Sequence, residues 1–291
     1  MYTKQHYLKR ITEEFSKVRF SRASFITNGW DDIVLILDDA TVFAFPKDPN
    51  EKNHSLQKEL RILPLLNTHI HSLKIPNFKY ISHDKTFAGY NFLKGIFLSG
   101  NLFKSLNEKE KDKVAKQLAT FLKELHSFPV AVAKKNGVGL AMRQKDAFVW
   151  LKSHIQVIKK KLSKDEQKIL EDLENPNFSF TPVVAHQDFG KSNILFDPQK
   201  RRLTGIIDFG DIQIADPAGD FARLWFYGEK FIDMIIHYYN SPDKGIKERS
   251  RYYSFVSDIH LMYYGVKKKR KDCWIGGYKT FKKFKKYYAY I

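Results

Sequence analysis

The chain has 291 residues, of which 43% are hydrophobic and 15% aromatic, so it holds ample material for a folded core and is not expected to be disordered. Lysine and arginine outnumber aspartate and glutamate by 50 to 32, and the net charge of +18 favours anionic partners or a solvated lysine-rich surface. The sequence lacks the roughly 20-residue apolar stretch of a membrane span, the charged start differs from a secretory signal, and the single cysteine excludes an internal disulfide framework, so we expect a cytoplasmic protein.

The first 90 or so residues predict a mostly β unit that carries one important helix. Aliphatic and β-branched runs alternate with short turns such as Asp38-Asp39, which is typical of antiparallel hairpins. A leucine stripe predicts the helix, which Pro64 should end or kink. Helices are expected over residues 1–15 and 55–66, and strands over residues 33–37, 41–45 and within 74–93.

Beyond Gly95 the predicted elements become mainly helical. The strongest is an amphipathic helix over residues 107–127, where Ser105 and Glu108 fit a capping box. The whole pattern predicts an α+β protein of two lobes, a β-rich N-terminal lobe at residues 1–92 and a mainly helical C-terminal lobe at residues 93–291. Further helices are expected over residues 147–161, 164–173, 231–236 and 252–262, interrupted by short strands within 183–211.

The interrupting stretch, VVAHQDFGKSNILFDPQKRRLTGIIDFGD, holds two apolar runs that each end in polar residues. Asp188 and Asn193 are five residues apart, and Asp208 follows the second run. Oxygen ligands from neighbouring loops suit Mg²⁺, and a carboxylate that does not bind the metal can orient a hydroxyl and accept its proton. These are the parts of a phosphoryl-transfer site. His186 is expected to brace the loop backbone.

The order H-x-D-x4-N, short hairpin, I-D-F-G-D resembles the kinase-like aminoglycoside phosphotransferases, and the similarity extends over nearly the whole chain. Residues 87–95 resemble the hinge between the two lobes of that family. Residues 28–31 resemble the loop over the nucleotide in the subgroup that modifies the 2-double-prime hydroxyl. Asp216-Pro217 with Asp220 matches the segment that follows the family's metal-binding aspartate.

The resemblance implies a two-lobed protein-kinase-like fold, a purine nucleoside triphosphate as phosphate donor, and Mg²⁺. Asp188 would be the catalytic base, and Asn193 and Asp208 would hold the metal. The nucleotide, ATP or GTP, would meet the first lobe, with Tyr90 at the back of its purine pocket. One hypothesis is that the Tyr90 side chain obstructs adenine and leaves guanine preferred, and the alternative is a core tyrosine without influence on the base. The residues implied on the nucleotide side are Asn28, Gly29, Glu59, Tyr90, Asn91 and Leu93, with the purine edge on the backbone of the last two.

One position departs from the kinase pattern. Kinase-like enzymes pair a strand lysine with a helix glutamate; Glu59 matches the glutamate, but Ala44 stands where the lysine is expected. Strand alternation points Lys47 to the other face of the sheet. Three explanations are open: the chain is an engineered inactive variant, Lys47 takes over the role, or the enzyme works slowly or not at all.

The acceptor is less constrained than the reaction. Asp211, Asp216 and Glu229 are the candidate partners for aminoglycoside amines, but the segment after Asp220 is aromatic rather than acidic. The function predicted first is therefore an aminoglycoside phosphotransferase of the antibiotic-resistance type. The alternatives are a kinase of another hydroxylated compound, such as a macrolide or a metabolite, and a catalytically silent nucleotide- or drug-binding protein.

The C-terminal residues 267–291 are strongly basic. Phe281, Phe284 and Tyr288 recur at helical spacing, which predicts a terminal helix that packs its aromatic stripe on the second lobe. Contact of the lysines with nucleic acid or anionic lipid is the competing interpretation. A monomer is the expected oligomeric state.

Overall fold

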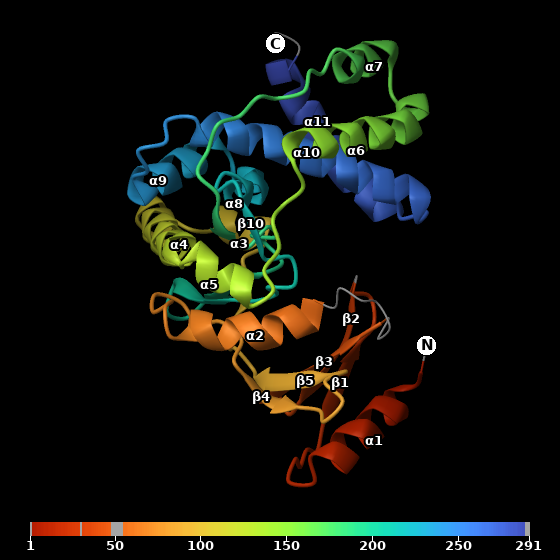
Figure 1. The fold of residues 1–291 in the computed structure, drawn as a ribbon, viewed down its shortest axis with the longest axis vertical. Helices are drawn as coiled ribbons and strands as arrows, with labels where there is room; N and C mark the ends of the chain where they lie inside the picture. Colours follow the sequence, from red (N-terminus) through yellow and green to blue (C-terminus); the bar gives the residue numbers. More distant parts are fainter. Residues whose placement is uncertain (1, 30, 48–54, 289–291) are drawn as a thin grey trace.

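The computed structural model describes residues 2–29, 31–47 and 55–288, and it forms two lobes (Figure 1). The first lobe is a five-stranded antiparallel sheet in the order β1-β2-β3-β5-β4. Figure 1 shows α1 on one side of this sheet and α2 on the side that faces the second lobe. The elements are α1 (Lys4–Glu14), β1 (Ala23–Ile26), β2 (Asp32–Leu37), β3 (Thr41–Pro46), α2 (Ser55–Asn67), β4 (Phe78–Ile81) and β5 (Ala88–Asn91).

The two faces of the sheet have different roles. Phe43 and Phe45 of β3 are fully buried against α1. Ala44 lies between them on the opposite face, where it pairs with Val34 of β2 and Ala88 of β5. Two residues earlier on the same face, Val42 pairs with Tyr90. Ala44 and Tyr90 therefore both face the side of the sheet away from α1.

Helix α2 continues through Pro64, so of the two predicted outcomes, an end or a kink, the end of the helix at this proline is wrong. Proline removes one backbone donor, but tertiary packing outweighs that loss. Leu63 and Leu66, on either side of it, are fully buried, and they belong to the core of the second lobe. The apolar face of α2 thus packs into the same cluster as the helices of the second lobe, and α2 also contacts β4 of the sheet.

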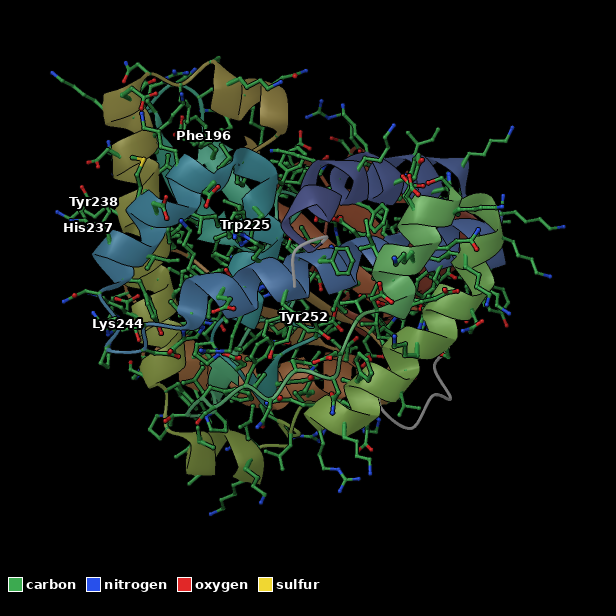
Figure 2. The ribbon with its side chains drawn as sticks, turned by 90° about the horizontal axis from the view of Figure 1, so that it is seen from above. Phe196, Trp225, His237, Tyr238, Lys244 and Tyr252 are labelled. Carbon is green, nitrogen blue, oxygen red and sulfur yellow. The ribbon has the colours of Figure 1, made fainter. Side chains whose placement is uncertain are left out.

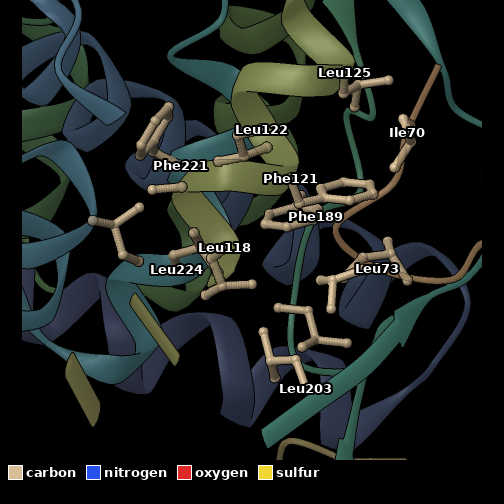
Figure 3. Packing of buried hydrophobic residues seen from close by; sticks show 14 of the residues in the cluster. Ile70, Leu73, Leu118, Phe121, Leu122, Leu125, Phe189, Leu203, Phe221 and Leu224 are labelled. Atoms are coloured by element: carbon tan, nitrogen blue, oxygen red, sulfur yellow. The ribbon is translucent and has the colours of Figure 1, made fainter. Parts of the chain in front are cut away.

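The second lobe is mainly helical, which confirms the α+β, two-lobed prediction. Helix α4 runs through its core, where Phe121 stacks on Phe189 at 5.5 Å between ring centroids (Figure 3). Seen from above, Trp225 lies inside the lobe and Tyr238 at its edge (Figure 2). Its helices are α3 (Gly100–Lys104), α4 (Glu108–Ser127), α5 (Val130–Lys135), α6 (Gln144–Ile158), η1 (Lys159–Lys161), α7 (Lys164–Glu171), α8 (Gly219–Ala222), η2 (Arg223–Tyr227), α9 (Glu229–Tyr239), α10 (Ile246–Lys267) and α11 (Lys271–Tyr288).

Short strands lie between these helices. Strand β6 (Ile96–Phe97) pairs with β8 (Ile194–Asp197), which pairs with β9 (Arg202–Ile206), and β7 (Val183–Ala185) pairs with β10 (Gln213–Ala215). Along the chain, β5 is thus the last strand of the first sheet, and the next strand, β6, pairs within the second lobe. The chain passes from the first sheet to the second lobe between β5 and β6, which is at the end of the predicted hinge at residues 87–95.

The cap of α4 differs from the predicted one. Asn107, not Ser105, is the N-cap; its side chain accepts a hydrogen bond from the Glu110 backbone, and the Glu110 carboxylate accepts one from the Asn107 backbone. Replacing Asn107 with alanine should lower the free energy of unfolding by about 1 kcal/mol. Chemical denaturation of this variant beside Ser105→Ala measures the difference, and an equal loss in both variants would contradict the assignment.

The basic C-terminal helix packs on the second lobe. Phe281 is fully buried, with its ring 5.6 Å from that of Phe255 on α10. A Cβ at Gly277 would lie 2.7 Å from the Asp258 carbonyl oxygen, so the two helices cross closely. The side chains of Phe284 and Tyr288 lie outside the described residues. Among the helices that the structure describes, none is sufficiently long and apolar to span a membrane.

Candidate active site

The loops after β7 and β9 bring the predicted polar residues together. The Asn193 side-chain amide donates to Asp188 Oδ2 at 2.7 Å and to the Asp188 carbonyl oxygen at 2.8 Å. The backbone of Ile207, just before Asp208, donates to the Asn193 carbonyl at 3.0 Å. His186 Nε2 lies 3.2 Å from the Ile207 carbonyl oxygen, so this imidazole connects the two loops. Residues separated along the chain thus share one site.

A fully buried carboxylate supports the loop that carries Asp188. Asp220 on α8 accepts backbone hydrogen bonds from His186 at 2.8 Å and from Gln187 at 2.7 Å. His126 at the end of α4 lies 3.0 Å from the same carboxylate. Burial opposes ionisation, but the His126 and Gln187 hydrogen bonds hold the pKa of Asp220 below its ordinary value. These supporting contacts were not predicted from the sequence. The available signal was Asp220 itself, a carboxylate at the start of an aromatic segment, which could have indicated a buried structural carboxylate.

The backbone at both loops is constrained. Gln187 and Asp208 have φ values of 69° and 67°, in the left-handed region that non-glycine residues seldom adopt. Such a conformation costs about 1–3 kcal/mol and persists only where the surroundings impose it. The hydrogen bonds around Asp220 and Asn193 supply those surroundings, so the two carboxylates at positions 188 and 208 are held in fixed places.

The donor set fits a divalent cation. Burial raises the pKa of Asp208, and the nearby charges of Asp188 and Asp211 raise it further. Crowded carboxylates of this kind are relieved by a hard cation such as Mg²⁺. No group of three or more His, Cys, Asp or Glu side chains with metal-binding geometry occurs in the described part of the chain. Asn193 and Asp208 would therefore share the ion with water and phosphate oxygens, as Mg²⁺ sites at nucleotides do.

Glu59 on α2 is predicted to lie near the nucleotide, but the strand lysine that is expected beside it is replaced by Ala44. Glu59 Oε1 accepts a hydrogen bond from the Phe209 backbone at 3.1 Å, which ties α2 to the loop of Asp208. Burial, together with the charges of Asp208 and Asp32, raises the pKa of Glu59 to about 8. A strand lysine would lower that pKa, but the strand carries Ala44 at this place. The high pKa of Glu59 therefore follows from burial without a strand cation beside it.

Lys47 does not fill the gap. It lines a cavity with Tyr7 and Phe45 on the α1 side of the sheet, and its ammonium donates to the Gly29 carbonyl oxygen. The Lys58 ammonium on α2 instead donates to the Ile212 carbonyl at 3.1 Å, close to the charges of Asp211 and Glu59. Three explanations for Ala44 were open, and this geometry disfavours the one in which Lys47 takes over the role of the expected strand lysine.

The remaining residues predicted at the nucleotide lie on the first sheet and in the segment that leaves it. Asn28 and Gly29 lie in the loop between β1 and β2. Asn91 ends β5, and Leu93 follows it in the segment between the two lobes. Tyr90 faces the same side as Ala44, and its phenol is close enough to Glu59 for burial and that charge to raise its pKa.

The three candidate acceptor residues are not equivalent. Asp216 is buried and bound by Arg249 at 2.7 and 3.0 Å, and Glu229 is shared between Lys247 at 3.1 Å and Arg251 at 2.6 Å. Neither carboxylate presents an unpaired charge, so each would have to give up a cation of this chain to meet an acceptor amine.

Asp211 differs from both. Burial raises its pKa, and the charges of Asp188 and Asp31 raise it further. It is therefore the member of the set that the structure brings to the Asp188 cluster.

The chain is similar to known proteins in fold and in sequence. The structure superposes with a TM-score of 0.85 on the GDP and kanamycin complex of APH(2'')-IIIa, at 25% identity over 96% of this chain and 98% of that one. The chain is 27% identical to the uncharacterized protein YcbJ of Bacillus subtilis (strain 168) over 172 residues, which are 54% of this chain and 55% of that protein. It is 32% identical to viomycin phosphotransferase of Streptomyces vinaceus over 72 residues, 24% of this chain and 25% of that enzyme.

The matches to these two relatives thus span about half of one and a quarter of the other. A family model covers far more of the chain. The model of the phosphotransferase enzyme family matches residues 22–252, which cover most of both lobes and the loops of Asp188 and Asp208, and the chain belongs to this family.

Proposed function

We propose that the chain transfers the γ-phosphate of a purine nucleoside triphosphate to a hydroxyl of an aminoglycoside. The observation that carries this proposal is the hydrogen bond of 2.7 Å between Asp188 and Asn193, beside Asp208. It places a carboxylate suited to proton acceptance beside Asn193, and the side-chain oxygens of Asn193 and Asp208 are of the type that Mg²⁺ prefers. Membership of the phosphotransferase family and the likeness to a structure that holds GDP and kanamycin support the same reaction.

In this mechanism Asp188 accepts the proton of the acceptor hydroxyl while the new oxygen–phosphorus bond forms and the bond to the nucleoside diphosphate breaks. Asn193 and Asp208 would hold Mg²⁺, which when bound neutralises phosphate oxygens. Asp220 and His126 keep the loop in place without touching the reactants. Most of the rate enhancement then comes from positioning and charge neutralisation. The reaction would take place in the cytoplasm, where the donor is available, with the chain as a monomer.

An acceptor screen tests the proposal. Aminoglycosides are incubated with Mg²⁺ and either ATP or GTP, and nucleoside diphosphate and phosphorylated product are measured together. Acceptor-dependent release with a matching mass gain of one phosphate is the expected result. Nucleotide binding without transfer to any acceptor would instead favour the catalytically silent alternative, for which Ala44 is the specific observation.

A second acceptor class belongs in the same screen because of a specific observation. Asp216 and Glu229 are already paired with cations of α10, and the chain carries a net charge of +18, so a polycation finds few free carboxylates here. Macrolides and small hydroxylated metabolites carry less positive charge. Transfer to one of these, with none to aminoglycosides, would keep the reaction and replace the acceptor.

Tyr90 is expected to set the donor. Its side chain faces the nucleotide side of the sheet, where a phenol obstructs the exocyclic amine of adenine and leaves guanine preferred. Replacing Tyr90 with methionine should lower the GTP-to-ATP ratio of kcat/KM by about tenfold or more. Tyr80→Met, on the α1 side of the same sheet, is the control and should leave the ratio unchanged. A preference for ATP in the unaltered chain would contradict the assignment.

A further inference from the structure

An arginine from outside both motif loops contacts the proposed catalytic base. Arg223 is the first residue of η2, directly after α8, and its Nε lies 2.7 Å from Asp188 Oδ1. The other oxygen of this carboxylate accepts the hydrogen bond of Asn193 at 2.7 Å. Asp188 is therefore held at both oxygens, by an amide from its own loop and by a cation from a distant segment.

The arginine side chain is itself held in place. A Cβ at Gly190 would lie 3.0 Å from Arg223 Cδ and 3.2 Å from its Cβ, so the stem of the arginine packs over this glycine. Two residues further along η2, Trp225 is buried, and its indole nitrogen donates to Ser250 Oγ at 3.0 Å. These contacts restrain the backbone and the stem of Arg223, while half of its side chain is exposed.

One short segment thus fixes the catalytic loop in two ways. Asp220 binds the backbone just before Asp188, and Arg223, three residues later, binds the Asp188 side chain. The charge of Arg223 also acts on two further carboxylates, Asp211 and Asp258. Burial raises the pKa of both, and the arginine charge offsets part of that rise. The guanidinium therefore lies among carboxylates, and the one that it contacts directly is Asp188.

We propose that Arg223 is a positioning residue for phosphoryl transfer. The inference rests on the proposed function. The guanidinium charge holds the Asp188 carboxylate from the Oδ1 side while Asn193 holds Oδ2, so that the carboxylate is oriented for the acceptor hydroxyl. The hydroxyl proton passes to Asp188, the hydroxyl oxygen bonds to phosphorus, and the nucleoside diphosphate leaves. Arg223 keeps its own protons throughout, because arginine is not deprotonated in proteins.

The test compares Arg223→Met and Arg223→Lys with Arg22→Met, which removes an exposed arginine of the first lobe. Steady-state kcat and KM are measured for acceptor and nucleotide, and nucleotide affinity is measured separately by calorimetry. Arg223→Met should lower kcat by about tenfold to a hundredfold, with nucleotide affinity within about twofold of the unaltered chain. Arg223→Lys should recover part of kcat, and added methylguanidine should raise kcat of an Arg223→Ala variant.

Gly190→Ala gives a second test that removes no charge. Its methyl group displaces the arginine stem, so kcat should fall while the melting temperature and nucleotide affinity stay close to those of the unaltered chain. An unchanged kcat in Arg223→Met would overturn the inference, as would a loss of nucleotide affinity equal to the loss of kcat. If the unaltered chain transfers phosphate while a variant gives either of these two results, the proposed function still holds and only the role of Arg223 is overturned. Absence of transfer by the unaltered chain overturns that function, and the role of Arg223 with it.

Discussion

Replacing Asp188 with alanine should lower acceptor-dependent phosphoryl transfer by about 10²- to 10⁴-fold. The carboxylate would no longer accept the hydroxyl proton, and the amide of Asn193 would lose its partner at 2.7 Å. Nucleotide affinity should change much less, because Asn193 and Asp208 still provide the metal ligands. Initial rates of product formation and nucleotide binding by calorimetry, measured on the same preparations, separate the two effects.

Two companion variants make this result specific. Asp188→Asn keeps the shape of the side chain but cannot accept the proton, so its rate should fall nearly as far as that of Asp188→Ala. Asp197→Asn removes a carboxylate at the end of β8, where it caps the turn to β9, and should retain nearly full activity. A rate for Asp188→Ala within tenfold of the unaltered chain would refute the assignment of Asp188 as the base.

Introducing lysine at position 44 should raise kcat/KM by on the order of 10²-fold, the size of effect seen when one electrostatic group is added or removed at a reacting centre. Ala44 lies on the face of β3 away from α1, and within the described part of the sheet no cation pairs with Glu59 of α2. A lysine would reach the α- and β-phosphates and favour the ionised form of Glu59, which lowers its pKa from about 8.

The controls separate charge from volume. Ala44→Met adds a chain of similar length without charge and should produce no gain. Glu59→Gln in the Ala44→Lys background removes the partner of the new lysine and should cancel most of the gain. Equal rates for the unaltered chain and the Ala44→Lys variant would show that a lysine at position 44 is not needed to stabilise the phosphates. The explanation that the chain is an engineered inactive variant would then be abandoned.

Local patterns in the sequence predicted most of the elements, because periodicity and turn residues act over a few positions. The helix of residues 107–127 and the hairpin around Asp38-Asp39 are found, and both turn residues have the positive φ that such a turn needs. The choice of Ser105 as cap failed because the competing Asn107 lies only two residues away. Pro64 failed as a stop because burial of its neighbours outweighs one lost hydrogen bond.

Partners that are distant in sequence were beyond such reasoning. Asp216 was expected at the acceptor, but Arg249, 33 residues later, neutralises it in the core. Arg223 gave no signal at all, since its segment is aromatic and belongs to no motif. Which carboxylates remain free is decided by the packing of α10 and η2 against the loops, and no spacing along the chain encodes that packing.

The position of α2 determines how the two lobes are coupled. Ile62, Leu63 and Leu66 belong to the core of the second lobe, whereas α1 and the five-stranded sheet enclose a separate core of their own. Glu59 at the other end of the helix is tied to Phe209. Because α2 also contacts β4, the sheet and the second lobe are coupled through this helix, and a displacement of the sheet would reach the loop of Asp208.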